Sequence, residues 1–160
     1  MELSSHIKSG GGVRMVDVSA KQITRRKAIA GGRVRLGHTA FDALVRGSVG
    51  KGDVLTTAQV AGIQAAKETG RLIPLCHPVP LDAVDLEFGF DEKELTVEVR
   101  ATVATAGRTG VEMEALTAVA IAALTIYDMC KSVSKAVQIT DIGLLRKEGG
   151  KSGLFVRSDS

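Results

Sequence analysis

Residues 108–131 read RTGVEMEALTAVAIAALTIYDMCK, and this stretch decides the fold. It is rich in Ala, Leu, Met and Glu, which favour helices, and it contains neither Gly nor Pro after Gly110. Nearly every residue from 115 to 123 is apolar, so that part has no polar face. Because a helix that is apolar on every side must be buried, the sequence predicts a central core helix. The apolar run is shorter than the roughly 20 residues that a bilayer requires, so we expect no membrane span.

Charged residues lie at both ends of this predicted helix. Glu112 and Glu114 fall in its first turns, where carboxylates suit the positive end of the helix dipole. Asp128 and Lys131 are three residues apart, so they share a face and can contact each other. At about 1.5 Å per residue, Glu114 and Asp128 lie roughly 21 Å apart. Either they serve opposite ends of a large substrate, or they belong to different sites that neighbouring subunits complete.

The composition indicates one mildly basic domain. The chain has 160 residues, of which 44% are hydrophobic and 3% aromatic, so its core must be built from Ala, Val, Leu and Ile. The net charge of +3 suits an anionic ligand, and the cations are too scattered to indicate nucleic acid. Cys76 and Cys130 are too few for a disulfide framework, and the first residues contain no apolar stretch typical of a signal peptide. We therefore expect a reduced, cytoplasmic protein.

The rest of the chain predicts strands interleaved with helices. Helices are expected at residues 39–46, 54–69 and 108–131, and strands at residues 28–36, 81–90, 94–103 and 136–145. This β-α-β-β-α-β order is the ferredoxin-like arrangement of the α+β class, with an antiparallel sheet and helices packed on one face. We expect a disordered tail at residues 1–14, a single domain at residues 15–153 and a polar tail at residues 154–160.

Two loops carry candidate site residues. Lys51 lies in a glycine loop just before Asp53, which is a good N-cap for the next helix. Backbone N–H groups, the helix dipole and the ammonium group would converge there, which favours phosphate binding. Cys76 and His77 lie in RLIPLCHPVP, where the chain's three prolines keep the loop stiff. His77 is either a residue that binds substrate or moves protons, or an ordinary turn histidine.

Other interpretations of these patterns stay open or are excluded. Asp128 and Lys131 form either a simple surface ion pair or a partly desolvated pair with shifted pKa values. Glu112 and Glu114 are either functional or only dipole partners. The GGKSG sequence at residues 149–153 is not a Walker site, because that motif requires glycine where Leu145 stands. A lysine loop that closes on an anion remains open. We expect no metal site, because adjacent Cys and His side chains rarely bind one ion.

Four blocks of the sequence together resemble one family. They are MVDVSAK, KGDVLTTAQVAGIQAAKETGRLIPLCHP, RTGVEMEALTAVAIAALTIYDMCK and GGKSG. Over residues 15–153 the chain resembles the cyclic pyranopterin monophosphate synthase family, the molybdenum cofactor biosynthesis protein C (MoaC) family. The resemblance implies a lyase that takes the cyclic dihydroguanosine triphosphate (3′,8-cyclo-7,8-dihydro-GTP) made from GTP by a radical partner enzyme. Its products would be cyclic pyranopterin monophosphate and diphosphate, in an early step of molybdenum cofactor biosynthesis.

The resemblance also implies a ferredoxin-like fold, no cofactor, and a homohexamer built as a trimer of dimers with active sites at subunit interfaces. Asp128 would be the catalytic acid–base residue, with Lys131 beside it and Lys51 as a further catalytic or phosphate-binding lysine. The residues that match the substrate site of the family are Leu75, Cys76, His77, Glu112, Met113 and Glu114. Four cations match charged positions of the same pocket, namely Lys21, Arg26, Lys67 and Lys147. Arg108 stands where many relatives have lysine. The positive charge is kept, but a guanidinium group contacts a phosphate with a different geometry from an ammonium group.

Two other classes of protein compete with this interpretation. An RNA-recognition module has the same β-α-β-β-α-β order, but it stacks bases on aromatic residues of its two central strands. Residues 28–36 and 94–103 contain no aromatic residue, so we expect no nucleic-acid partner. A non-catalytic nucleotide sensor would keep the lysines but would not need Asp128 beside Lys131.

Overall fold

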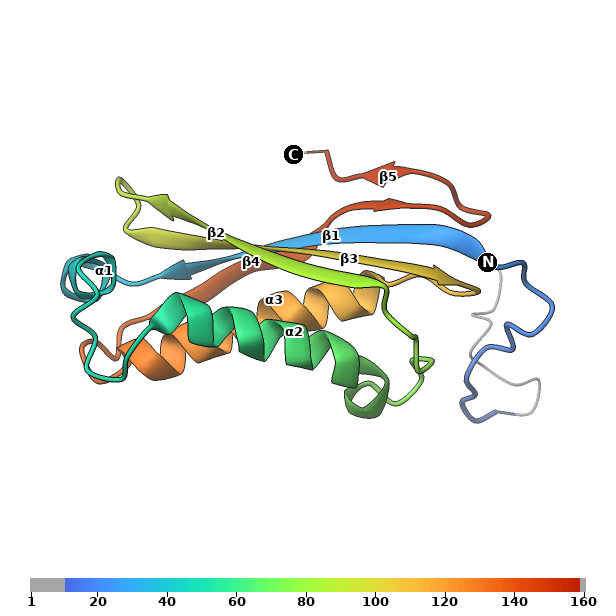
Figure 1. The fold of residues 1–160 in the computed structure, drawn as a ribbon, viewed down its shortest axis with the longest axis horizontal. Coiled ribbons are helices and arrows are strands. Elements are labelled where there is room, and N and C mark those ends of the chain that lie inside the picture. The colour runs from blue at the N-terminus through green and yellow to red at the C-terminus, as the bar shows by residue number, and fades with distance from the viewer. Residues whose placement is uncertain (1–10, 159–160) are drawn as a thin grey trace.

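An antiparallel sheet covered by helices on one face forms the body of the molecule (Figure 1). A computed structural model describes residues 11–158 of the chain. The strands are β1 (Thr24–Arg35), β2 (Ala83–Asp91), β3 (Thr96–Gly107), β4 (Gln138–Glu148) and β5 (Phe155–Val156). The helices are α1 (His38–Val45), α2 (Val54–Leu72) and α3 (Glu112–Cys130). The spatial order β2-β3-β1-β4-β5, with antiparallel pairing throughout, confirms the predicted ferredoxin-like α+β arrangement.

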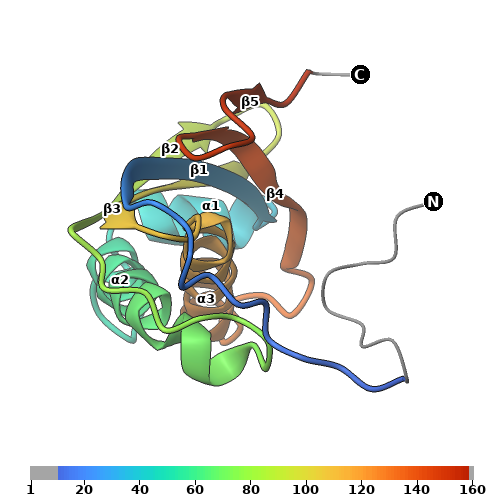
Figure 2. The same ribbon diagram turned by 90° about the vertical axis from the view of Figure 1, so that its right-hand side faces the viewer.

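The predicted core helix is confirmed as α3. It packs against β1, β3, β4 and α2, and Figure 2 shows α2 and α3 side by side beneath the sheet. Gly62 of α2 makes this approach possible, because a Cβ atom there would lie 3.0 Å from the carbonyl oxygen of Ala118. By length and composition alone, the 19 residues of α3 are sufficient to cross a membrane, contrary to the expectation that the run is too short. Its burial against the sheet and α2 is that of a core helix.

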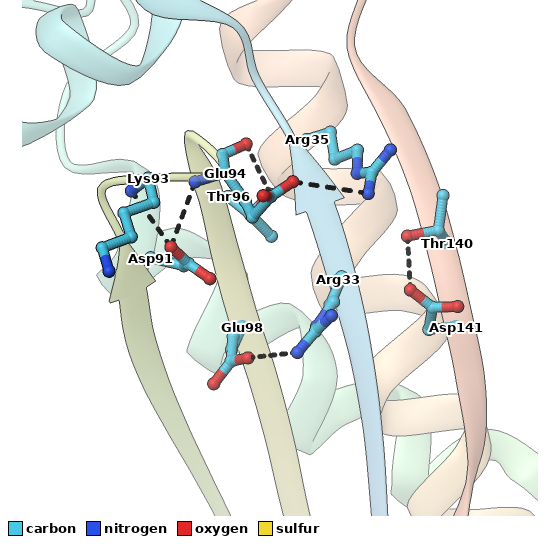
Figure 3. Close-up of polar contacts among 9 residues, drawn as sticks. All are labelled: Arg33, Arg35, Asp91, Lys93, Glu94, Thr96, Glu98, Thr140 and Asp141. Atoms are coloured by element: carbon cyan, nitrogen blue, oxygen red, sulfur yellow. Dashed lines mark hydrogen bonds and ion pairs between the residues drawn. The ribbon is translucent and has the colours of Figure 1, made fainter. Parts of the chain in front are cut away.

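The hairpin between β2 and β3 is confirmed, with its turn at residues 91–95. Oδ1 of Asp91 accepts hydrogen bonds from the backbone N–H groups of Lys93 and Glu94, at 3.0 and 3.1 Å (Figure 3). Beyond the turn, Glu98 of β3 pairs with Arg33 of β1 at 2.9 Å across the sheet. These two charged side chains are exposed, whereas Val34 and Val97, which pair next to them, are buried in the core.

The strands differ in length from the prediction. β1 begins at Thr24, four residues earlier than expected, because β1 and β3 pair without interruption from Thr24 opposite Gly107 to Arg35 opposite Thr96. Such cross-strand pairing overrides weak local propensity. Within the segment predicted as a polar tail from residue 154, Arg157 donates its backbone N–H to the carbonyl oxygen of Leu145 and β5 forms on the edge of β4. Residues 1–10 of the predicted disordered tail lie outside the described residues.

The two long helices differ in whether a side chain caps their N-terminus. Asp53 is confirmed as the N-cap of α2, because its side chain accepts from the backbone N–H of Thr56 at 3.0 Å. By contrast, α3 begins at Glu112, and its N-cap residue Val111 makes no side-chain cap. The capped start of α2 fixes the loop that carries Lys51.

Candidate active site

One charged cluster lies at the C-terminal end of α3. Nζ of Lys51 lies 2.9 Å from Oδ2 of Asp128 and also donates to its carbonyl oxygen at 2.8 Å. Nζ of Lys131 lies 2.5 Å from Oδ1 of the same carboxylate. The loop before α2 therefore brings a second lysine to the pair that was predicted from the sequence of α3.

The electrostatics of this cluster correct the expectation of a partly desolvated pair. The Asp128 side chain is 54% exposed in the chain, and hydrogen bonds first from Lys131 and then from Lys51 lower its pKa to about 2. The same contact raises the pKa of Lys131. Because neither carboxylate nor ammonium is buried, ion pairing outweighs desolvation. The cluster is therefore one carboxylate between two ammonium groups, with a surplus of positive charge.

A cavity of about 310 Å³ lies at the other end of α3. Seven of the residues predicted for the substrate site line it, namely Lys21, Leu75, Cys76, His77, Glu112, Met113 and Glu114. Sequence reasoning missed five further lining residues, namely Val16, Val18, Val79, Thr109 and Gly110. They carry no distinctive chemistry, and only the fold brings them to the cavity.

Glu114 is the buried acid of the cavity. It is 4% exposed, and desolvation, assisted by the nearby charge of Glu112, raises its pKa. The Cys76 thiol also has a raised pKa, because it is partly buried and faces the charge of Glu114. Cys76 therefore remains a neutral thiol, whereas Glu114 holds a proton at higher pH than an ordinary glutamate and can act as an acid.

His77 is held in a defined orientation. Its Nε2 atom lies 2.7 Å from the carbonyl oxygen of Val16. Since a carbonyl oxygen only accepts, Nε2 carries the hydrogen and Nδ1 of the neutral ring is left as an acceptor. This contact also fixes residues near Val16 against the loop after α2, and Figure 2 shows this N-terminal segment crossing in front of α3. His77 thus belongs to the wall of the cavity.

The predicted cations differ in the contacts that they make near the cavity. Lys147 pairs with Glu112 at 3.0 Å, so it borders the cavity without lining it. Nε of Arg108 donates to the carbonyl oxygen of Lys21 at 3.2 Å, which supports the backbone of that lysine. Arg26 donates from Nε and Nη2 to the backbone carbonyls of Gly107 and Arg108. Two of its guanidinium nitrogens are therefore occupied by the loop before α3.

Lys67 is the predicted site residue that lies apart from both groups. It lines a separate cavity of about 570 Å³, together with Arg71 and the proline-containing loop at residues 78–80. The structure thus gathers the predicted residues into two groups at opposite ends of α3, as the distance argument requires. Within one chain these two groups do not meet.

The fold and its two charged groups define a ferredoxin-like α+β domain suited to an anionic ligand. The model of the MoaC family matches residues 15–150. The chain is 54% identical over 159 residues to "Cyclic pyranopterin monophosphate synthase" of Heliobacterium modesticaldum, covering 99% of this chain and 100% of that protein. Proteins of the same name from Salinibacter ruber and Thermoanaerobacter pseudethanolicus are 54% and 49% identical, covering 93% and 96% of this chain and 88% and 97% of theirs. The chain belongs to the MoaC family.

Proposed function

We propose that this protein is a cyclic pyranopterin monophosphate synthase, a lyase of molybdenum cofactor biosynthesis. It converts 3′,8-cyclo-7,8-dihydro-GTP into cyclic pyranopterin monophosphate and diphosphate. The observation that carries this proposal is the 54% identity to a relative of that name over nearly the whole of both chains. The reduced thiols Cys76 and Cys130 fit a cytoplasmic location, where the radical partner enzyme would supply the substrate.

The chemistry requires the charges that the two groups provide. A ribose hydroxyl oxygen bonds to the α-phosphorus, while the bond from that phosphorus to the bridging oxygen breaks and its electron pair leaves with diphosphate. The hydroxyl proton passes to a base, for which we propose Asp128. Lys51 and Lys131 stabilise the negative charge that develops on the phosphate oxygens. Glu114, whose pKa is raised by burial, would act as the proton donor in rearrangement of the ring.

Substrate binding would also prepare Asp128 for this role. A carboxylate whose pKa is about 2 accepts protons poorly. A bound phosphate competes for the ammonium groups of Lys51 and Lys131, which weakens their hydrogen bonds to Asp128. The pKa of Asp128 then rises toward its ordinary value, so the base becomes effective when substrate is present.

A second copy of the chain is needed to bring the two groups together. The face of α3 that the sheet and α2 leave uncovered includes Met113 and Leu124, which are 38% and 52% exposed. Met113 and Asp128 lie roughly 22 Å apart along this helix, with Ala120 halfway. If two copies pack α3 against α3 in antiparallel fashion about a two-fold axis near Ala120, Asp128 of each lies opposite Met113 of the other. We infer that such pairs complete the active sites and assemble into the hexamer.

Complementation between inactive variants tests this assembly. Asp128→Ala and Glu114→Gln chains are prepared separately, then unfolded and refolded together in equal amounts. Random pairing of the subunits would restore about a quarter of the wild-type sites, because half the dimers are mixed and each mixed dimer has one intact site. Activity no greater than that of the separate variants would contradict a shared site. Sedimentation analysis of the same samples checks that the refolded chains assemble.

A coupled assay tests the activity itself. GTP, the radical partner enzyme and this protein are combined, and the product is oxidised to its fluorescent pterin. Product formation must depend on this chain. Folded wild-type protein that gives no product would instead favour the nucleotide sensor. An RNA-binding module would share this fold, but it lacks support in the sheet, since the central strands β1 and β3 carry no aromatic residue.

A further inference from the structure

A second hollow, of about 890 Å³, lies beside the cavity at the N-terminal end of α3 and shares Lys21 with it. We call it the cationic hollow. Its lining residues are Lys21, Gln22, Thr24, Arg26, Gly150, Lys151 and Ser152. They include three cations and no carboxylate, whereas the cavity is lined by Glu112 and Glu114. The two adjoining spaces therefore suit ligand groups of different charge.

The turn that carries Lys151 is fixed in place by contacts on two sides. Gly149 and Gly150 have positive φ angles of 96° and 72°, which favour glycine. A Cβ atom at Gly149 would clash with the backbone carbonyl oxygen of Arg25, so glycine at this position lets the turn lie against β1. On the other side, Nζ of Lys147 donates to Oγ of Ser152 at 2.9 Å. The position of Lys151 is thus set by its neighbours.

Lys151 itself is available to a ligand. It is exposed, and within residues 11–158 it has no ion pair or hydrogen-bonded side-chain partner. Nearby, the hydroxyl of Thr24 is shielded from solvent and has no hydrogen-bond partner among the described residues. Buried hydroxyl groups in native proteins usually have a hydrogen-bond partner. The Thr24 hydroxyl and the Lys151 ammonium group are therefore both able to donate to a ligand in the hollow.

We propose that the cationic hollow binds the terminal diphosphate of the substrate and that Lys151 is one of its phosphate-binding residues. This inference rests on the proposed function. The triphosphate is attracted by Lys21, Arg26 and Lys151 of the hollow, whereas Lys21 is the one lysine or arginine among the residues that line the cavity. The ring system therefore occupies the cavity, and the phosphate chain passes beside Lys21 and enters the cationic hollow. As the bond to the α-phosphorus breaks, the electron pair moves onto the diphosphate, where these cations stabilise the added charge.

Binding of inorganic diphosphate tests the hollow independently of turnover. Calorimetric titrations of the assembled wild-type protein, Lys151→Ala and Lys93→Ala are compared at the same salt concentration. Lys93 is an exposed lysine in the β2–β3 turn, at the opposite end of the β1–β3 pairing, and serves as the matched control. We expect the dissociation constant for diphosphate to rise about tenfold in Lys151→Ala, because one charge-assisted hydrogen bond is lost. In Lys93→Ala we expect the dissociation constant to stay unchanged. Equal weakening in both variants, or none in Lys151→Ala, overturns the proposal.

Inhibition of turnover by diphosphate separates this inference from the proposed function. We expect Lys151→Ala to raise KM for the substrate and to weaken product inhibition by a similar factor. If the wild type turns over but Lys151→Ala is inhibited by diphosphate as strongly as the wild type, the function stands and the inference fails. If diphosphate binding depends on Lys151 but the wild type gives no product, the hollow is an anion site and the proposed function fails.

Discussion

Lys51 and Asp128 are 77 residues apart in the chain, yet Nζ of Lys51 lies 2.9 Å from Oδ2 of Asp128. The contact joins the glycine loop before α2 to the last turns of α3. It places Asp128 between two ammonium groups, because Lys131 contacts the other carboxylate oxygen. The ionisation of Asp128 therefore depends on a residue that is distant in sequence.

The first prediction concerns the titration of Asp128. We expect its carboxyl group to titrate near pH 2 in the wild-type protein. Because the folded pKa lies below the ordinary value of 3.8, the associated stability is present above pH 3.8 and is lost as the pH falls through about 2. Lys51→Ala and Lys131→Ala should each raise the pKa, whereas Lys93→Ala should not. Carboxyl NMR titration measures it, and an unshifted Asp128 would contradict the ion-pair geometry.

The second prediction separates catalysis from stability at the same residue. We expect Asp128→Ala to reduce turnover at least about 100-fold, because a general base is lost. The free energy of unfolding should change much less than turnover, because the ion pairs of Asp128 are exposed to solvent. Urea denaturation and the coupled assay give the two values, and Asp128→Asn serves as the variant of matched size. Retained turnover would exclude a catalytic role for Asp128.

The third prediction concerns the buried acid Glu114. Burial raises its folded pKa, so the unfolded chain releases this proton first as the pH rises. The folded state therefore loses stability as the pH rises from 4.5, the ordinary pKa of glutamate, through the raised pKa of the folded state. Glu114→Gln should lack this loss, so its stability relative to the wild type should increase from pH 4 to pH 7, as read from urea denaturation at each pH. Parallel curves for the two proteins would refute the raised pKa.

The fourth prediction concerns the contact between α2 and α3. A Cβ atom at Gly62 would lie 2.5 Å from Cδ2 of Leu86 and 3.0 Å from the carbonyl oxygen of Ala118. We expect Gly62→Ala to lower the free energy of unfolding by about 1–3 kcal/mol, because overpacking outweighs the better helix propensity of alanine. Gly89→Ala is the control, since its Cβ atom would make only ordinary contacts. A urea midpoint for Gly62→Ala equal to that of the wild type would show that the two helices have room to separate.

Local patterns in the sequence were sufficient for the helices and for part of the site. Residues 115–123, which are apolar except for Thr117, indicated a buried helix whatever its neighbours, and Asp53 marked the start of α2 by its side-chain chemistry. The spacing of Asp128 and Lys131 predicted their contact, because both lie on one helix. Strand ends were predicted less well. The first residues of β1 are charged, and only pairing with β3 makes them a strand.

The sequence by itself therefore determined the order of the elements, the family motifs and the core helix. It also determined the two groups of charged residues at the ends of that helix. The tertiary structure decided the ionisation of those residues. Lys51 reaches Asp128 and lowers its pKa, while the fold around Glu114 removes water and raises the pKa of that carboxyl group. The physical reason is that helix formation depends on neighbours a few residues away, whereas a pKa depends on every charge and solvent molecule nearby in space.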